Sequence, residues 1–160
     1  MKPCGTGPEH GIPIPGGRRR VLLSSVSSDA HTWNLIYLQL LLEERGHEVH
    51  NLGPCVPDEL LLSTCRRLAP DLVVISTVNG HGAADGGRLI RGLRAQRDLE
   101  RLPVVIGGTI GTRAAAPGTY APALLGAGFD AVFENGDGLR DFCRFVDTVP
   151  ARRLTGAGSR

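Results

Sequence analysis

The sequence lacks any apolar run approaching the roughly 20 residues that a membrane-spanning helix needs, and its N-terminus lacks the apolar segment of a secretory signal. These absences indicate a cytoplasmic protein with no membrane association, whose thiols stay reduced. The four cysteines, Cys4, Cys55, Cys65 and Cys143, show no C-x-x-C spacing. We therefore expect neither a zinc site nor a redox-active pair, and we interpret these residues as buried or unreactive thiols.

Two phosphate-binding motifs are also missing. No G-x-G-x-x-G follows the first apolar segment, and no G-x-x-x-x-G-K-[ST] occurs anywhere in the chain. Dinucleotide and P-loop chemistry therefore lack their phosphate cradle. The formal net charge is only +2, and Lys2 is the single lysine. So small a charge does not indicate a nucleic-acid partner.

The length of the chain, 160 residues, suits one domain that buries about two thirds of the surface exposed by its unfolded form. Residues 1–17 are so rich in proline and glycine that we expect a flexible leader, and residues 150–160 form a similar tail. The predicted domain therefore occupies residues 18–149.

Between these ends, short apolar runs alternate with longer amphipathic segments. Strands are predicted at 20–26, 47–53, 71–77, 102–108 and 130–136, and helices at 32–46, 56–69, 86–100, 121–128 and 138–148. Strands that are apolar almost throughout indicate a parallel sheet covered by helices on both faces. We expect an α/β, doubly wound, flavodoxin-like or Rossmann-like domain whose five-stranded parallel sheet has the order 2-1-3-4-5.

Ligands of such sheets bind beyond the carboxyl ends of the strands, here between the first and third strands. The first strand is followed by SSDAHTWN, residues 27–34. Ser28 or Asp29 could cap the following helix, with His31 an exposed residue of its first turn. Alternatively, Asp29 could accept a hydrogen bond from one nitrogen of His31. The other nitrogen would then present its lone pair to a metal whose remaining ligands come from a macrocycle.

The segments after the third and fourth strands are less specific. Ser76 and Thr77 place hydroxyls where an apolar strand ends. Gly107 and Gly108 permit either the close approach of a ligand to the backbone or a tight turn. A phosphorelay receiver would carry a phospho-acceptor aspartate after the third strand, where this chain has hydroxyl and apolar residues. The serines within 24–28 leave a flavodoxin-type phosphate loop open as an alternative.

Taken together, these segments resemble the cobalamin-binding domain family, whose signature is D-x-H-x-x-G, S-x-L and G-G at the ends of the first, third and fourth strands. In the same order, the chain offers Asp29-Ala-His31, Ser76-Thr-Val78 and Gly107-Gly108. Its S-D-x-H form, NLG after the second strand and GFDAVFENGDG near the end are most similar to small subunits of glutamate mutase (methylaspartate mutase). The resemblance covers roughly residues 19–148.

The resemblance implies adenosylcobalamin as the cofactor. His31 would be the metal ligand, binding cobalt in place of the benzimidazole of the coenzyme, and Asp29 would support it by a hydrogen bond. Ser76 would meet the displaced nucleotide tail, and Gly107 and Gly108 would let this tail slide between sheet and helices. The other residues expected to contact the cofactor are Ser28, Ala30, Thr32, Thr77, Val78, Thr109 and Ile110.

Two positions depart from the family pattern. Asn34 stands where the motif has glycine, and Val78 where it has leucine. A side chain at position 34 that overpacked the site would cost about 1–3 kcal/mol of binding free energy. We expect instead that Asn34 is accommodated and that its amide binds the loop or a corrin side-chain amide, since Trp33 beside it indicates a rebuilt loop.

The resemblance also implies a hetero-oligomer, in which a large, epsilon-type subunit binds glutamate for conversion to 3-methylaspartate and this chain supplies no catalytic residue. Three alternatives remain open: a corrinoid carrier for methyl transfer, a cobalamin-responsive regulator or binding module without enzymatic activity, and a flavodoxin-like interaction domain without a cofactor. The proline-rich leader disfavours the helical cap that carriers usually add, and no pair of DNA-binding helices is evident.

Overall fold

The computed structural model describes residues 14–112, 115–116, 118–134 and 138–152. Most of the predicted leader and tail therefore lies outside the described residues. Their described ends meet the body of the domain. The backbone N–H of Arg152 donates to the carboxylate of Asp71 (2.8 Å), which also accepts from the backbone N–H of Arg20 (2.7 Å). One buried carboxylate thus joins the start of the sheet to the end of the described chain.

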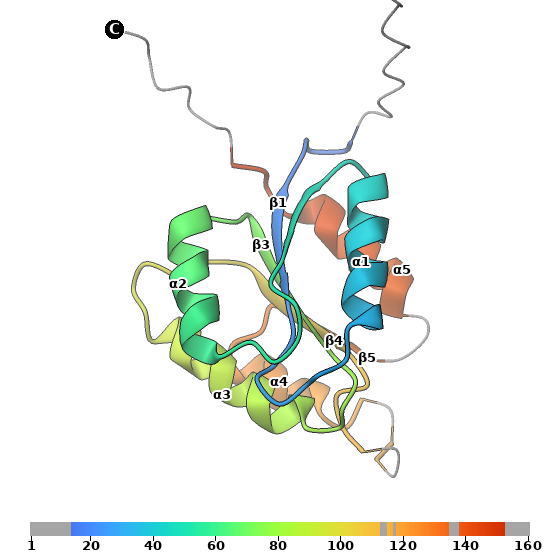
Figure 1. Ribbon diagram of the computed structural model, residues 1–160, viewed down its shortest axis with the longest axis vertical. Helices are drawn as coiled ribbons and strands as arrows, with labels where there is room; N and C mark the ends of the chain where they lie inside the picture. Colours follow the sequence, from blue (N-terminus) through green and yellow to red (C-terminus); the bar gives the residue numbers. More distant parts are fainter. Residues whose placement is uncertain (1–13, 113–114, 117, 135–137, 153–160) are drawn as a thin grey trace, which may run out of the picture.

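Five parallel strands form one sheet in the order β2-β1-β3-β4-β5, which confirms the predicted topology. The strands are β1 (Arg20–Ser24), β2 (Glu48–Asn51), β3 (Leu72–Thr77), β4 (Val104–Gly108) and β5 (Ala131–Glu134). The helices are α1 (Trp33–Glu44), α2 (Asp58–Leu68), α3 (Gly82–Arg94), α4 (Ala121–Ala127) and α5 (Gly138–Thr148). Helices α1 and α5 cover one face of the sheet, and α2, α3 and α4 cover the other (Figure 1).

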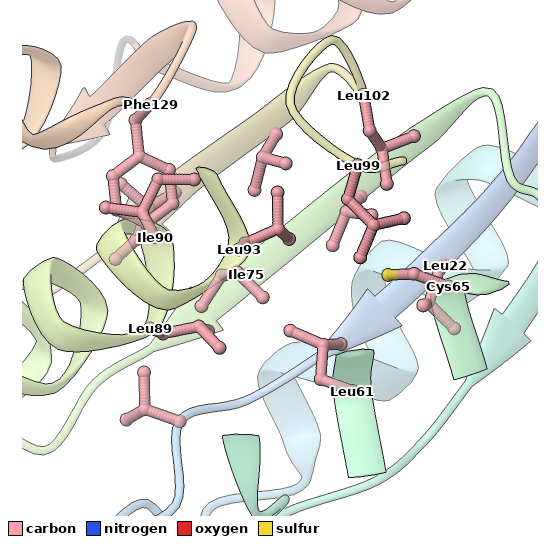
Figure 2. Packing of buried hydrophobic residues seen from close by; sticks show 14 of the residues in the cluster. Leu22, Leu61, Cys65, Ile75, Leu89, Ile90, Leu93, Leu99, Leu102 and Phe129 are labelled. Carbon is pink, nitrogen blue, oxygen red and sulfur yellow. The ribbon is translucent and has the colours of Figure 1, made fainter. Parts of the chain in front are cut away.

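The two faces of the sheet have separate apolar cores because successive side chains of a strand point in opposite directions. Leu22 and Ile75 belong to the core under α2, α3 and α4, whereas Leu23 and Val74 belong to the core under α1 and α5. Figure 2 shows the first of these cores, with Leu22 and Ile75 among the side chains of the covering helices. Strands that are buried on both faces explain the almost unbroken apolar runs of the sequence.

The predicted bounds of α3, 86–100, are wrong at both ends. The helix begins four residues earlier, at Gly82, because glycine allows its first turn to lie directly against the end of β3. After Arg94 the chain turns instead of continuing as a helix. The guanidinium of Arg94 donates to the carbonyls of Leu99 (3.3 Å), Glu100 (3.0 Å) and Leu102 (2.7 Å), which holds this loop in a non-helical path.

The cysteines of the described residues are free and differ in exposure. Cys65 is buried, and burial raises the pKa of its thiol to about 11, as expected of an unreactive residue. Cys143 is half-buried and Cys55 is exposed, so of the two alternatives, buried or unreactive, only the second applies to Cys55. Cys4 lies outside the described residues.

Within the described ranges, no helix has both the length and the apolar character that crossing a bilayer requires.

Substituting alanine for two different glycines of α3 is expected to change the stability of the protein in opposite directions. A Cβ on Gly82 would lie 2.3 Å from Thr77 Cγ2 and 3.1 Å from the carbonyl oxygen of Ile110. We expect Gly82→Ala to lower the free energy of unfolding by about 1–3 kcal/mol through overpacking. A Cβ on Gly92 meets nothing within 4 Å, so Gly92→Ala is expected to raise stability by about 0.5–1 kcal/mol through helix propensity. Urea unfolding of both variants measures the difference, and equal effects would contradict the close packing of α3 on β3.

Candidate functional site

The carboxylate of Asp29 is the best-connected polar group at the carboxyl edge of the sheet. Its side chain is fully buried. Oδ1 accepts hydrogen bonds from the backbone N–H of His31 (3.0 Å) and from His31 Nδ1 (2.6 Å). Oδ2 accepts from the hydroxyl of Thr77 (2.8 Å) and from the backbone N–H of Val78 (2.7 Å). One carboxylate thus ties the β1–α1 loop to the end of β3.

These hydrogen bonds keep Asp29 ionised. Burial is the largest single influence on the carboxyl and acts to raise its pKa. The hydrogen bonds from His31, Val78 and Thr77 together outweigh burial, so the pKa of Asp29 lies below its ordinary value. An ionised carboxylate accepts but does not donate hydrogen bonds. The Nδ1 atom of His31 therefore carries the shared hydrogen.

The side chain of His31 has one nitrogen bound to protein and one free to bind a ligand. Its imidazole is 59% exposed, although the carboxylate it contacts is fully buried. With Nδ1 donating to Asp29, the neutral ring has its lone pair on Nε2. The ring is therefore oriented in the way that histidine ligands of metals usually are.

Neither of the predicted capping residues caps helix α1. The helix begins at Trp33 after Thr32, and no side chain caps its first turn. Asp29 instead turns back toward β3, as described above. Of the two interpretations that the sequence left open, the helix cap is wrong, and the structure contains the hydrogen bond between Asp29 and His31 on which the other interpretation depends.

Ser27 and Ser28, which precede Asp29, are bound by charged side chains of α3. The hydroxyl of Ser28 donates to the carboxylate of Asp85. This hydrogen bond is the largest cause that holds the pKa of Asp85 below its ordinary value. Arg88 bridges Asp85 (2.7 Å), Asp58 (2.9 Å) and the hydroxyl of Ser27 (3.0 Å). The hydroxyls of Ser27 and Ser28 are both bound by side chains of α3, so a flavodoxin-type phosphate loop is not supported here.

A cavity of about 330 Å³ opens beside this edge, on the face of the sheet that α1 and α5 cover. This volume lies in the range of small-ligand sites. Most of its lining is apolar or glycine. The lining residues are Asn34, Tyr37, Leu38, Val74, Ile75, Ser76, Val78, Val105, Gly107, Gly108, Thr109, Phe133, Gly138, Leu139 and Phe142.

The paired glycines at the end of β4 are required by the packing of the strands. Gly107 and Gly108 lie in register with Ser76 and Thr77 of β3. Gly108 has a φ of +109°, and a Cβ there would lie 2.2 Å from the carbonyl oxygen of Thr77. A Cβ on Gly107 would lie 3.0 Å from the carbonyl oxygen of Phe133 on the other neighbouring strand. The same two glycines leave the cavity wall without side chains.

Asn34 takes the space beside this wall that the motif glycine would leave open. Its Nδ2 donates to the hydroxyl oxygen of Ser76 (2.8 Å), so the side chain is accommodated by a residue of β3. The expected partner in the loop is wrong, because the amide NH₂ binds a residue of β3 instead. The Oδ1 atom of Asn34 is buried and accepts no hydrogen bond from the residues that the structure describes.

The structure brings most of the candidate residues together in two adjoining groups. Asp29, His31 and Thr77 form the hydrogen-bonded group, with Ser28 at its border. The candidates that line the cavity are Ser76, Val78, Gly107, Gly108 and Thr109.

Three candidates lie apart from both groups. Ala30 is exposed on the loop. Thr32 borders a separate depression between α1 and β2. Ile110 packs in the core on the opposite face of the sheet.

The sequence motifs did not identify the apolar residues that line the cavity. Tyr37 and Leu38 of α1, Phe133 at the end of β5 and Leu139 and Phe142 of α5 all line it. Leu38 follows Asn34 by four residues, and Phe142 follows Gly138 by four residues. Each pair therefore lies on one face of its helix. The sequence offered no means of distinguishing such apolar residues from ordinary core.

No set of three or more His, Cys, Asp or Glu side chains within the described ranges is arranged to hold a metal ion. A metal at His31 therefore needs most of its ligands from another molecule. A macrocycle is the kind of ligand that provides them.

Comparison with protein-family models matches residues 19–140 to the B12 binding domain. Over 129 residues the chain is 30% identical to the glutamate mutase sigma subunit of Halobacterium salinarum, covering 81% of this chain and 83% of that one. It is also 33% identical over 96 residues to the HTH-type transcriptional repressor CarA of Myxococcus xanthus. That alignment covers 60% of this chain and only 32% of the repressor.

Among solved structures, a cobalamin-binding protein from Desulfitobacterium hafniense superposes with a TM-score of 0.63 at 22% identity. The superposition covers 80% of this chain and 58% of that one, and at this identity it concerns the fold alone. The family match runs from just before β1 into α5 and contains Asp29, His31 and the cavity wall of β3 and β4. The chain belongs to the B12-binding domain family.

Proposed function

We propose that this domain holds a corrinoid with its nucleotide base detached from cobalt and with Nε2 of His31 as the lower ligand. The observation that carries this proposal is the hydrogen bond between His31 and the buried carboxylate of Asp29. It fixes the tautomer of an exposed imidazole at the carboxyl edge of the sheet, where ligands of this fold bind. An adjacent cavity is available for the detached tail.

In this arrangement Asp29 controls the electron density at His31. A carboxylate that accepts the Nδ1 hydrogen raises the basicity of the opposite nitrogen. Thr77 and the backbone of Val78 in turn keep the carboxylate ionised and stationary. The chain therefore orients the imidazole before a ligand arrives, which reduces the ordering that binding requires.

The finer assignment is to the small subunit of an adenosylcobalamin-dependent carbon-skeleton mutase that converts glutamate to 3-methylaspartate. The alignment with the sigma subunit of Halobacterium salinarum supports it, because it spans 83% of that protein. Adenosylcobalamin supplies radical chemistry through its cobalt–carbon bond. The residues of this chain bind and orient the cofactor, and none is assigned to glutamate.

A large mutase subunit is the partner proposed for this role. Four apolar side chains are exposed along α1, which begins two residues after His31: Trp33, Ile36, Tyr37 and Leu40. Trp33 is 82% exposed. An exposed apolar stripe of this kind is typical of an interaction surface. A subunit that covers the cofactor at the sheet edge would also cover the start of this stripe.

A second candidate function is a cobalamin-responsive regulator without enzymatic activity. The 33% identity to the CarA repressor favours it, although the alignment covers a third of that protein. Both candidates require the same binding site. They differ in whether a mutase partner confers turnover.

The first prediction concerns the cobalt ligand. Electron paramagnetic resonance of the Co(II) form, with nitrogen-15 histidine, is expected to report a histidine nitrogen on cobalt in the wild type. His31→Ala removes this signal, because Nε2 is the proposed ligand. His81→Ala is the control, since His81 is an exposed histidine at the start of α3. A wild-type spectrum that shows the benzimidazole nitrogen still bound to cobalt would contradict the proposal.

A second prediction tests the support given by Asp29. Asp29→Asn replaces one carboxylate oxygen with an NH₂ group, which faces hydrogen-bond donors in either orientation: His31, or Thr77 and Val78. We expect cobalamin affinity to fall about 10- to 100-fold, the usual effect of losing such a partner of a metal ligand. Asp98→Asn is the matched control, because Asp98 is paired with Arg66 on the surface. Calorimetric titration measures both variants, and an unchanged affinity in Asp29→Asn would argue against the role of the carboxylate.

A third prediction concerns activity. The isolated chain with adenosylcobalamin is expected to leave glutamate unchanged, since no residue of the chain is assigned to the substrate. Addition of a glutamate mutase large subunit is expected to give 3-methylaspartate, measured by proton NMR. Turnover by the isolated chain would refute the division of labour. Absence of turnover with the large subunit would favour the regulator.

A further inference from the structure

The loop between β1 and α1, residues 25–32, carries His31 but contains neither helix nor strand. Its position therefore depends on contacts with neighbouring elements. Asp29 supplies two of them: its carboxylate binds the end of β3, and its backbone carbonyl accepts a hydrogen bond from the N–H of Cys55 (2.8 Å). Ser28, the residue before Asp29, contacts a third element, the first turn of α3.

The hydroxyl of Ser28 takes part in two hydrogen bonds. It donates to the carboxylate of Asp85 in α3, and it accepts from Nδ2 of Asn79 (3.0 Å). The pKa of Asp85 lies below its ordinary value, with the hydrogen bond from Ser28 as the largest cause. The acceptor is therefore an ionised carboxylate, and hydrogen bonds to ionised groups are stronger than those between neutral groups.

The carboxylate of Asp85 is itself held in place. Arg88, three residues later on α3, donates to its other oxygen (2.7 Å). The same guanidinium binds Asp58 of α2 (2.9 Å) and the hydroxyl of Ser27 (3.0 Å). The side chain of Asp85 is only 16% exposed. The position of the group that binds Ser28 is thus set by α2 and α3 rather than by the loop.

We infer that Asp85 is a positioning residue of the corrinoid site, which acts through Ser28 to hold the loop that presents His31. The inference rests on the proposed function, because His31 is the proposed ligand of cobalt. Asp29 orients the imidazole ring, whereas Asp85 fixes the backbone directly before Asp29. Without Asp85 the loop keeps its hydrogen bonds to β3 but gains freedom at Ser28, and cobalamin binding must then order this segment.

The experiment measures the affinity of the full chain for cobalamin by absorbance titration. The variants are Asp85→Ala, Ser28→Ala and the combination of the two. Asp141→Ala is the matched control. Asp141 also lies in the first turn of a helix and is paired with the arginine three residues later, Arg144, but it belongs to α5 and is 66% exposed.

We expect Asp85→Ala to weaken cobalamin binding by about 3- to 10-fold, the net value of one hydrogen bond, and Asp141→Ala to bind like the wild type. The double variant is expected to bind no more weakly than Ser28→Ala alone, because both substitutions remove the same hydrogen bond. Wild-type affinity in Asp85→Ala would overturn the inference. Additive losses in the double variant would also overturn it, since Asp85 would then act independently of Ser28.

A second measurement needs no corrinoid. Nitrogen-15 NMR of the histidines in the ligand-free chain reports which nitrogen of His31 carries the hydrogen. We expect Nδ1 in the wild type and in Asp141→Ala, and a larger share of the Nε2–H tautomer in Asp85→Ala. A loss of stability alone would leave this signal unchanged, so an unchanged signal in Asp85→Ala would contradict the inference.

The two measurements separate the inference from the proposed function. Failure of the wild type to bind cobalamin would refute the proposed function, and the NMR comparison would still decide whether Asp85 positions His31. Cobalamin binding that is equally tight in the wild type and in Asp85→Ala would refute the inference and leave the proposed function standing.

Discussion

The hydrogen bonds to the carboxylate of Asp29 are the interaction on which the site depends. This group is fully buried in the loop between β1 and α1, where an unpaired charge would be costly. Four donors, two from His31 and one each from Thr77 and Val78, make its ionised form favourable. Because those donors lie on the β1–α1 loop and at the end of β3, satisfying the carboxylate also sets the position of the loop. The orientation of His31 is therefore a consequence of folding rather than of ligand binding.

Some residues at the carboxyl edge are needed both for the packing of the sheet and for the shape of the site. Gly108 has to lack a side chain because Thr77 of the neighbouring strand lies against it, and Thr77 is also a donor to Asp29. Gly82 brings the first turn of α3 against the same threonine. A substitution at any of these positions would change packing and ligand geometry together. The carboxyl edge between β3 and β4 therefore supports both the hydrogen-bonded group of His31 and the cavity.

The sheet order and the oriented imidazole could be predicted from the sequence, because buried parallel strands and the D-x-H spacing have direct physical consequences. The start of α3 could not, since Gly82 has low helix propensity and its close packing against Thr77 and Ile110 is a tertiary contact that local sequence does not show. Ile110 follows the glycine pair in sequence but turns into the opposite core. The hydrogen bond between Asn34 and Ser76 joins residues 42 positions apart, so no local sequence pattern could predict it. The family resemblance marked position 34 as unusual, and the structure supplied its partner.

A crystal structure of the chain in complex with a corrinoid tests the account most directly. The account predicts a bond between cobalt and Nε2 of His31, with Nδ1 still donating to Asp29. It also predicts the tail base between Asn34 and Phe133, in the cavity under α1 and α5. A corrinoid that retains its own base on cobalt, or one that leaves this cavity without the tail, would contradict it.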